Sequence, residues 1–191
     1  MSRVVIFYGT TEGQTAKIAQ HIADVGRNAG HQVDLQHAAE LDPDFSLAPY
    51  DAAILGASVH EGRHQQYMVD LARGQARWLS DHPSAFFSVC LSIASDDPEE
   101  RAEAQAIADH FTASVGWAPP HRTVVAGALR YSEYSWLKRM LMKRIAAKES
   151  GDTDTSRDYE YTDWEAVTAW AKHFYATLGE DRSRKQLVGR G

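Results

Sequence analysis

Short apolar runs alternate with helical stripes along most of the chain, and this alternation predicts the architecture. The apolar runs at 4–7 and 85–91 are typical of strands buried on both faces of a sheet, whereas residues 32–37 alternate and suit an outer strand. The five predicted strands are residues 4–7, 32–37, 51–55, 85–91 and 123–128. The segments with helical periodicity are residues 14–28, 65–79, 97–115 and 162–179.

Strands that alternate with helices pair in parallel, because each helix carries the chain back across the sheet. We therefore expect an α/β fold of three layers, in which a doubly wound, five-stranded parallel sheet has helices on both faces. Residues 129–157 interrupt the alternation and are predicted to form an insertion at the last strand, which residues 158–161 close as a short returning strand. We expect a single domain over residues 1–179, followed by a polar tail at 180–191.

Capping residues mark the expected ends of the helices. Asp97 followed by Pro98 is a strong start for the third helix. Thr162 and Glu165 have the spacing of a capping box at the start of the last helix, and Gly179 marks its expected end.

A polar loop rich in hydroxyl groups joins the first strand to the first helix. Amide and hydroxyl groups at a helix N-terminus bind anions, and Gly13 can adopt the positive φ that such a loop needs. Neither Gly-Lys-Ser/Thr nor Gly-x-Gly-x-x-Gly is present, so a monophosphate is favoured. The alternative is an ordinary strand-to-helix turn capped by threonine. The candidate phosphate-binding residues are Thr10, Thr11, Glu12, Gly13, Gln14 and Thr15.

The composition limits the class of protein. The 191 residues suffice for one α/β domain with a sizeable core, and a net charge of −6 argues against a general nucleic-acid binder. Cys90 is the only cysteine, so no disulfide forms within the chain; we expect it to be a core residue, and a reducing compartment fits. No signal peptide is recognised and no apolar run approaches about 20 residues, so we expect a soluble or membrane-surface protein. The histidines show no metal-binding spacing.

The loop at residues 8–15, with the sequence YGTTEGQT, resembles the FMN phosphate loop of flavodoxins. Glu12 followed by Gly-Gln-Thr is closer to the menaquinone-dependent protoporphyrinogen oxidases, a flavodoxin-like class of bacterial haem synthesis. The segment AGALRY at 126–131, followed by the insertion, is the more specific signal. Further similar segments are residues 54–58, 83–89, 151–155 and 161–165.

This resemblance implies a flavodoxin-like fold, non-covalent FMN, and oxidation of protoporphyrinogen IX to protoporphyrin IX with menaquinone or ubiquinone as acceptor. It also implies a cytoplasmic protein that lies peripherally at the inner face of the cell membrane. Electron-carrier flavodoxins usually place Trp or Tyr in the two loops beside the flavin ring, and this chain does not, which leaves at least one face open to a flat substrate. The implied loop residues are Ser58, Val59, His60, Glu61, Gly62, Ser92, Ile93, Ala94 and Ser95.

His60 is open to two interpretations, contact with the flavin or simple exposure. Arg63 either meets a substrate propionate or is solvated. We nominate no catalytic acid or base.

The insertion is basic although the whole chain is acidic. Apolar residues are interleaved with its cations, and a helix at about 135–149 is expected. It has three possible roles: covering the sheet edge, contacting the membrane through long basic side chains, or binding the substrate's propionates. The residues nominated for substrate or membrane contact are Arg63, Arg130, Tyr131, Trp136, Lys138, Arg139, Lys143 and Arg144.

Three other functions remain open at this stage. A flavodoxin that only carries electrons would need an acidic docking face around the flavin, which the basic insertion disfavours. A flavodoxin-fold quinone reductase would be reduced by a nicotinamide cofactor. An interaction module that has lost flavin binding is the third.

Overall fold

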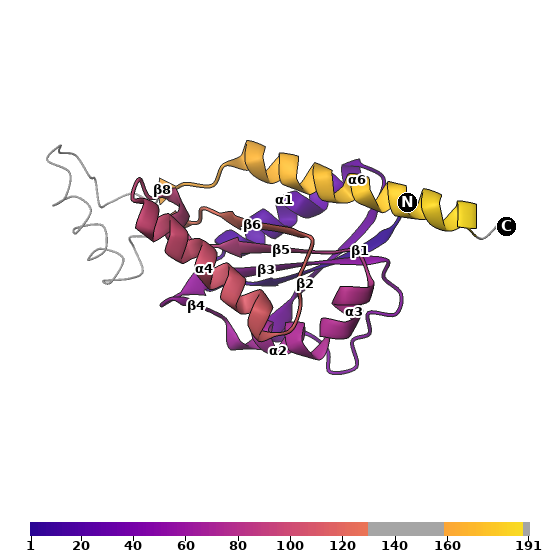
Figure 1. Ribbon diagram of the computed structural model, residues 1–191, viewed down its shortest axis with the longest axis horizontal. Helices are drawn as coiled ribbons and strands as arrows, with labels where there is room; N and C mark the ends of the chain where they lie inside the picture. The colour runs from indigo at the N-terminus through magenta and orange to yellow at the C-terminus, as the bar shows by residue number, and fades with distance from the viewer. Residues whose placement is uncertain (130–158, 189–191) are drawn as a thin grey trace, which may run out of the picture.

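The computed structural model describes residues 1–129 and 159–188, and within this part a parallel sheet of five strands forms the centre. Its order is β2-β1-β3-β5-β6, which confirms the predicted doubly wound topology (Figure 1). The strands are β1 (Arg3–Gly9), β2 (Gln32–His37), β3 (Ala52–His60), β5 (Ser84–Val89) and β6 (His121–Val125).

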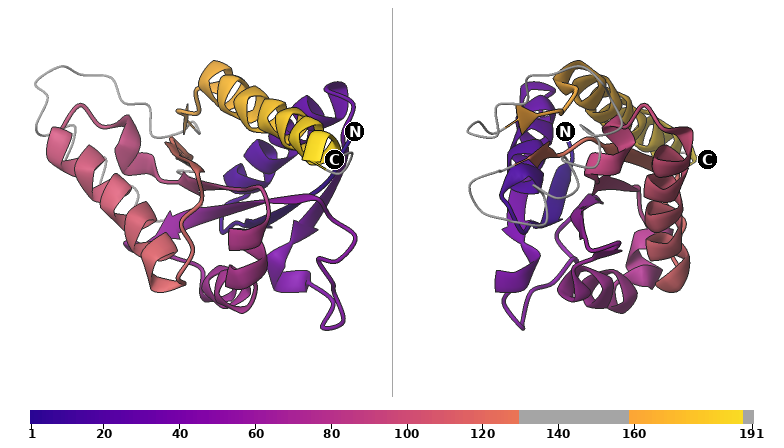
Figure 2. Two further views of the ribbon diagram at one scale, coloured as in Figure 1. Left: turned by 45° about the vertical axis from the view of Figure 1, so that its right-hand side comes forward. Right: turned by 90° about the vertical axis from the view of Figure 1, so that its left-hand side faces the viewer.

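Helices cover both faces of the sheet, which makes the three expected layers (Figures 1 and 2). On one face, α1 (Gln14–Asn28) and α6 (Trp164–Val188) pack against Val4 and Ile6 of β1. On the other, α2 (Gln66–Gly74), α3 (Ala76–Asp81) and α4 (Pro98–Ser114) pack against Val5 and Phe7. Successive residues of a strand point to opposite faces, so the apolar run of β1 supplies both cores.

Some helix boundaries follow the sequence pattern, and others do not. Helix α1 has the predicted bounds, and Asp97 caps α4 by accepting a hydrogen bond from the backbone N–H of Glu99 at 2.8 Å. The helix expected at 65–79 is divided into α2 and α3. Gln75, with φ −108° and ψ 9°, leaves the helical conformation directly after Gly74, where the chain has most freedom.

Strand β3 is longer than predicted. It continues past residue 55 to His60 and forms an antiparallel hairpin with β4 (Arg63–His64), so the residues expected as a loop at 58–62 belong to this hairpin. The tip residues Glu61 and Gly62 both have positive φ, 50° and 75°, as two-residue hairpin turns require. The sequence lacks the Asn-Gly or Asp-Gly pair that signals such turns, which is why the hairpin was missed.

The end of the sheet differs slightly from expectation. Strand β5 ends at Val89 and is followed by the 3₁₀ turn η2 (Leu91–Ala94), while β6 ends three residues before the predicted 128. The short strands β7 (Ala128–Leu129) and β8 (Tyr159–Glu160) pair antiparallel, which confirms the returning strand. A second 3₁₀ turn, η1 (Ala38–Glu40), follows β2.

Two predictions about the last helix are wrong. Asp163, not Thr162, caps α6, since its carboxylate accepts from the backbone N–H of Ala166 at 2.9 Å. Thr162 instead donates to the backbone carbonyl of Ala126 at 2.8 Å. The helix also passes through Gly179 and reaches Val188, because one glycine inside a helix costs only about 1 kcal/mol.

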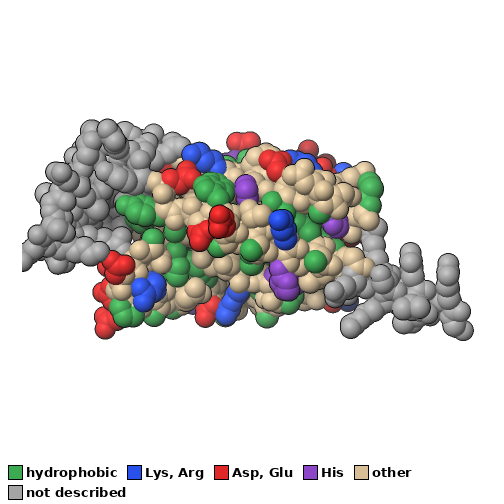
Figure 3. All heavy atoms as spheres, turned by 90° about the horizontal axis from the view of Figure 1, so that it is seen from above, with side chains coloured by type: hydrophobic (Ala, Val, Ile, Leu, Met, Phe, Trp, Pro, Cys, Tyr) green, Lys and Arg blue, Asp and Glu red, His purple; other side chains and the backbone are tan. Residues whose placement is uncertain are grey.

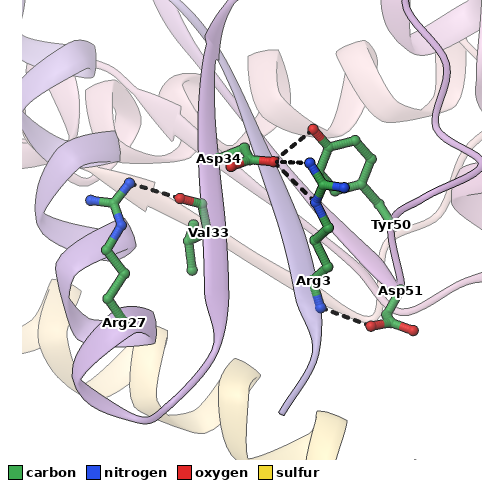
Figure 4. A network of polar contacts seen from close by, with 6 residues as sticks. All are labelled: Arg3, Arg27, Val33, Asp34, Tyr50 and Asp51. Atoms are coloured by element: carbon green, nitrogen blue, oxygen red, sulfur yellow. Dashed lines mark hydrogen bonds and ion pairs between the residues drawn. The ribbon is translucent and has the colours of Figure 1, made fainter.

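A polar network joins β1, β2 and the segment before β3 at the amino ends of the strands (Figure 4). Asp34 accepts hydrogen bonds from the Nη2 of Arg3 and the hydroxyl of Tyr50, both at 2.9 Å. The backbone N–H of Arg3 donates to Asp51 at 2.7 Å, and Arg27 donates to the carbonyl of Val33. These contacts support the register of β1 and β2 at the edge remote from the predicted phosphate loop.

Residues nominated in the insertion lie outside the described part of the chain, namely Arg130, Tyr131, Trp136, Lys138, Arg139, Lys143 and Arg144, together with the helix expected at about 135–149. Within residues 1–129 and 159–188, no helix combines the length and apolar character needed to cross a bilayer.

Candidate functional site

A crevice of about 280 Å³ opens at the carboxyl ends of β1, β3 and β5, and the three predicted loop segments meet there. Eleven of the predicted residues line it. They are Thr10, Thr11, Glu12, Gln14 and Thr15 from the first segment, Ser58, Val59, His60, Glu61 and Gly62 from the second, and Ser92 from the third.

The first segment has the geometry of an anion-binding loop. Gly13 adopts φ 85° immediately before α1, and its backbone N–H donates to the Oγ1 of Thr10 at 2.8 Å. Thr15, in the first turn of α1, is fully buried, and its Oγ1 has no hydrogen-bond partner among the described residues. A buried hydroxyl left unsatisfied costs about 1–3 kcal/mol. A phosphate oxygen at the helix N-terminus would satisfy it, so the donor set fits a flavin phosphate.

Gln65 connects the first and second segments, a role that no local sequence pattern predicted. Its side-chain amide donates to the hydroxyl of Thr11 at 3.2 Å and to the hydroxyl of Ser58. Its Oε1 is buried without a partner in the part of the chain that the structure describes. Gln65 thereby holds the hairpin against the phosphate loop.

The third segment contributes less than predicted. Ile93, Ala94 and Ser95 lie in or just after η2 and do not line the crevice. Ser95 is buried, and its hydroxyl accepts from the backbone N–H of Asp97 while its carbonyl accepts from Arg101 at 2.7 Å. These contacts fix the start of α4.

Seven lining residues were not predicted. Glu103 and Ile107 come from α4, which overhangs the crevice; no local pattern marks them, because the helix reaches the site only through tertiary packing. The others follow the ends of β5 and β6, where the rule for ligand sites in open sheets would have found them: Val89, Cys90, Leu91, Gly127 and Ala128. Cys90 is buried, as predicted; burial raises the pKa of its thiol, and the charge of Glu103 adds to the rise.

His64, two residues beyond the predicted loop at 58–62, is buried in β4 and does not line the crevice. Its Nε2 lies 2.9 Å from the hydroxyl of Ser88, and its ring contacts Phe86 and Phe111. Burial lowers the pKa of His64 to about 4, so the imidazole is neutral at pH 7. Among the described residues, no three His, Cys, Asp or Glu side chains gather as a metal site would need.

The sheet is doubly wound, a loop suited to anion binding follows its first strand, and two further loops lie at the same edge. Together these features define the class of flavodoxin-like FMN proteins. A family model described as a flavodoxin domain matches residues 5–156. Flavodoxin 1 from Bacillus cereus superposes with a TM-score of 0.55 at 19% identity, covering 91% of this chain and 97% of that one. A flavodoxin from Streptococcus pneumonia TIGR4 superposes with a TM-score of 0.56 at 18% identity, covering 92% of this chain and 99% of that one. These likenesses show the fold.

Sequence relatives are more specific. The chain is 33% identical over 171 residues to the protoporphyrinogen IX dehydrogenase [quinone] of Escherichia coli strain K12, covering 89% of this chain and 93% of the relative. It is 32% identical over 178 residues to the protein of the same name from Leishmania major, covering 91% and 75%. The chain belongs to the flavodoxin-domain family and, within it, to the protoporphyrinogen IX dehydrogenases.

Proposed function

We propose that this protein binds FMN non-covalently in the crevice and oxidises protoporphyrinogen IX to protoporphyrin IX, with menaquinone or ubiquinone as the electron acceptor. The substrate and the electron acceptor are inferred from membership of the family. The position of the cofactor is inferred from the buried Thr15 hydroxyl, which has no hydrogen-bond partner among the described residues. The activity belongs to haem biosynthesis.

The phosphate would be held at the start of α1. Thr15 and Thr10 supply hydroxyl groups, and Gly13 turns the backbone so that the free N–H groups of the first turn face the anion. The hairpin segment from Ser58 to Gly62 would form one wall beside the flavin ring, with Gln65 fixing its distance from the phosphate loop.

FMN supplies a hydride acceptor, and the chain's own residues position it and limit water around it. Apolar groups at Val89 and Ile107, together with the thiol of Cys90, line the crevice. Neither the hairpin segment nor Ser92 and its neighbours includes Trp or Tyr, so no large ring of these segments covers the flavin. A flat macrocycle then has room to approach.

The test is anaerobic mixing of the purified, yellow protein with fresh protoporphyrinogen IX, followed by absorption spectroscopy. We expect the flavin band near its oxidised maximum to bleach, and menaquinone or ubiquinone to restore it. A flavin that stays oxidised in the presence of protoporphyrinogen would contradict the proposal. Rapid bleaching by NADPH alone would point to a nicotinamide-fed quinone reductase, and a persistent one-electron form during titration to a carrier.

We also propose peripheral contact with a membrane surface through the segment at 130–148, whose sequence combines six cations with Trp, Leu, Ile and Met residues. Quinones reside in lipid, so contact would bring the acceptor near the site. Cosedimentation with vesicles containing anionic lipid should retain the protein, and neutral vesicles or high salt should release most of it. Equal recovery with both vesicle types would rule out the electrostatic part.

A further inference from the structure

A second hollow lies beside the flavin crevice, between the hairpin and α2 on one side and α4 on the other. Its volume is about 470 Å³, within the range of small-molecule sites. Gly62, Glu103 and Ile107 line both hollows, so the two lie side by side. A molecule seated in the second would therefore lie next to the proposed flavin site.

The walls of this hollow are helical stripes. Val69 and Arg73 lie four residues apart on α2, and Ile107 and Phe111 lie four apart on α4, so each pair shares one face of its helix. Helix α2 follows β4, which returns antiparallel to β3 from the hairpin tip, and α4 follows η2 at the carboxyl end of β5. Both helices therefore run away from that edge of the sheet. At 1.5 Å per residue, the wall from Gln66 to Arg73 is roughly 10 Å long. The hollow is thus an elongated, partly apolar slot.

The charges around the slot are unequal. Arg63 and Arg73 line it. Arg73 meets Asp70 only at 3.8 Å, and no ion pair of Arg63 occurs within residues 1–129 and 159–188. Glu103 lies at the end next to the flavin. By contrast, acidic and basic side chains are intermixed over the described residues of the face that α1 and α6 form (Figure 3).

We propose that this slot binds the tetrapyrrole itself, with its macrocycle against Val69, Ile107 and Phe111 and its two propionates paired with Arg63 and Arg73. The inference rests on the proposed function. Protoporphyrinogen IX is an amphiphile with an apolar body and two carboxylates, which complements an apolar wall with two available guanidinium groups. A quinone headgroup is uncharged and would form an ion pair with neither arginine.

The test uses the FMN-loaded protein and two stable probes, protoporphyrin IX and its dimethyl ester, titrated by fluorescence. We expect the parent to bind the diacid at least tenfold more tightly than the ester. Arg73→Gln and Arg63→Gln should each weaken the diacid about fivefold and leave the ester unchanged, because only the diacid loses a charged partner. Ala106→Trp, at an exposed position of the slot wall, should weaken both probes.

Two controls carry the same substitutions elsewhere. Arg77→Gln changes an arginine of α3 that is 97% exposed and does not line the slot, and Gln105→Trp places the ring on the opposite face of α4. Both should bind the probes as the parent does. The proposal would be overturned if the parent bound the diacid and the ester equally well. It would also be overturned if the arginine variants weakened the binding of both probes equally.

Two further rate measurements distinguish substrate binding in the slot from quinone binding there and from failure of the proposed function. In rapid mixing, Ala106→Trp should slow flavin reduction by protoporphyrinogen and leave reoxidation by quinone unchanged. The reverse pattern would assign the slot to the quinone. A parent flavin that protoporphyrinogen never reduces would refute the proposed function, whereas the choice between diacid and ester, measured on the oxidised protein, reports on the slot alone.

Discussion

At the scale of single residues, two buried polar groups explain much of the site. The Thr15 hydroxyl is enclosed at the mouth of α1 without a partner in the described residues, a cost that an anionic ligand removes. The His64 imidazole is the opposite case, since Ser88 satisfies one ring nitrogen and burial keeps the ring uncharged. One group is prepared for a ligand, and the other anchors the hairpin beside it.

The phosphate loop gives the first prediction. Thr15→Val should weaken FMN binding about tenfold, because it removes one hydrogen bond to a charged oxygen. Gly13→Ala should also weaken it, because alanine resists the φ of 85° that aims the amide groups. Quenching of FMN fluorescence measures the affinity of both variants for FMN.

Gly30→Ala is the matched control for Gly13→Ala. It has the same strain at φ 84°, at the far end of α1, and should retain parental affinity. Unchanged binding in both loop variants would remove the proposed phosphate seat.

His64 gives a dependence of stability on pH. Its folded pKa of about 4 lies below the ordinary value, so between about pH 6.5 and 4 the unfolded chain binds a proton that the folded protein does not. The stability contributed by the neutral ring is complete above pH 6.5, and on the order of 3 kcal/mol is lost as the pH falls to 4. His64→Gln does not titrate, so urea unfolding at pH 7 and 4.5 should show a smaller loss for it. Parallel losses in both proteins would contradict this account.

At the scale of elements, strand β1 contributes to structure at both of its ends. Its carboxyl end leads into the phosphate loop, and its amino end is joined to β2 through the network of Arg3, Asp34 and Tyr50. Burial alone would raise the pKa of Asp34, but the hydrogen bonds from Tyr50 and Arg3 outweigh it and lower the pKa. Binding and register are therefore fixed at opposite edges.

This separation predicts that the two ends respond independently. Asp34→Ala should lower the free energy of unfolding by about 1 kcal/mol, because it leaves the part-buried Tyr50 hydroxyl without its acceptor, and FMN affinity should not change. Urea unfolding and FMN titration check the two halves. Asp24→Ala removes an exposed ion pair with Arg27 within α1 and should cost less than about 0.5 kcal/mol. A large loss of FMN affinity in Asp34→Ala would show that the ends are coupled.

At the scale of the whole molecule, both ligand sites depend on elements that are distant in sequence. The crevice combines the carboxyl ends of β1, β3, β5 and β6 with the start of α1 and one face of α4, and the slot beside it is bounded by α2 and α4. Helices α1 and α6 cover the other face and line no part of the slot among the described residues (Figure 2). A ligand that spans these elements stabilises the fold as a whole.

Removal of FMN should therefore lower the melting temperature. Free FMN at 100 times its Kd contributes about 2.7 kcal/mol, which for a chain of this size corresponds to roughly 5–10 °C. Differential scanning calorimetry with and without added FMN measures the shift. Riboflavin at the same concentration lacks the phosphate and should give a clearly smaller shift. Equal shifts for FMN and riboflavin would show that the loop at Thr10 to Thr15 contributes little.

Local pattern by itself determined the strand-helix alternation, the parallel sheet order and the bounds of α1, and it gave the prediction of a phosphate loop. These features depend on side-chain periodicity and on capping chemistry that neighbouring residues supply. Resemblance in sequence then indicated the cofactor and the reaction.

Only the tertiary structure decided the β3–β4 hairpin, the burial of His64, the link that Gln65 makes to Ser58, and the contribution of Glu103 and Ile107. Each of these depends on contacts between segments that close only when the sheet and α4 pack together. A single sequence does not encode such contacts in a local pattern, because their free energy comes from burial shared by distant residues.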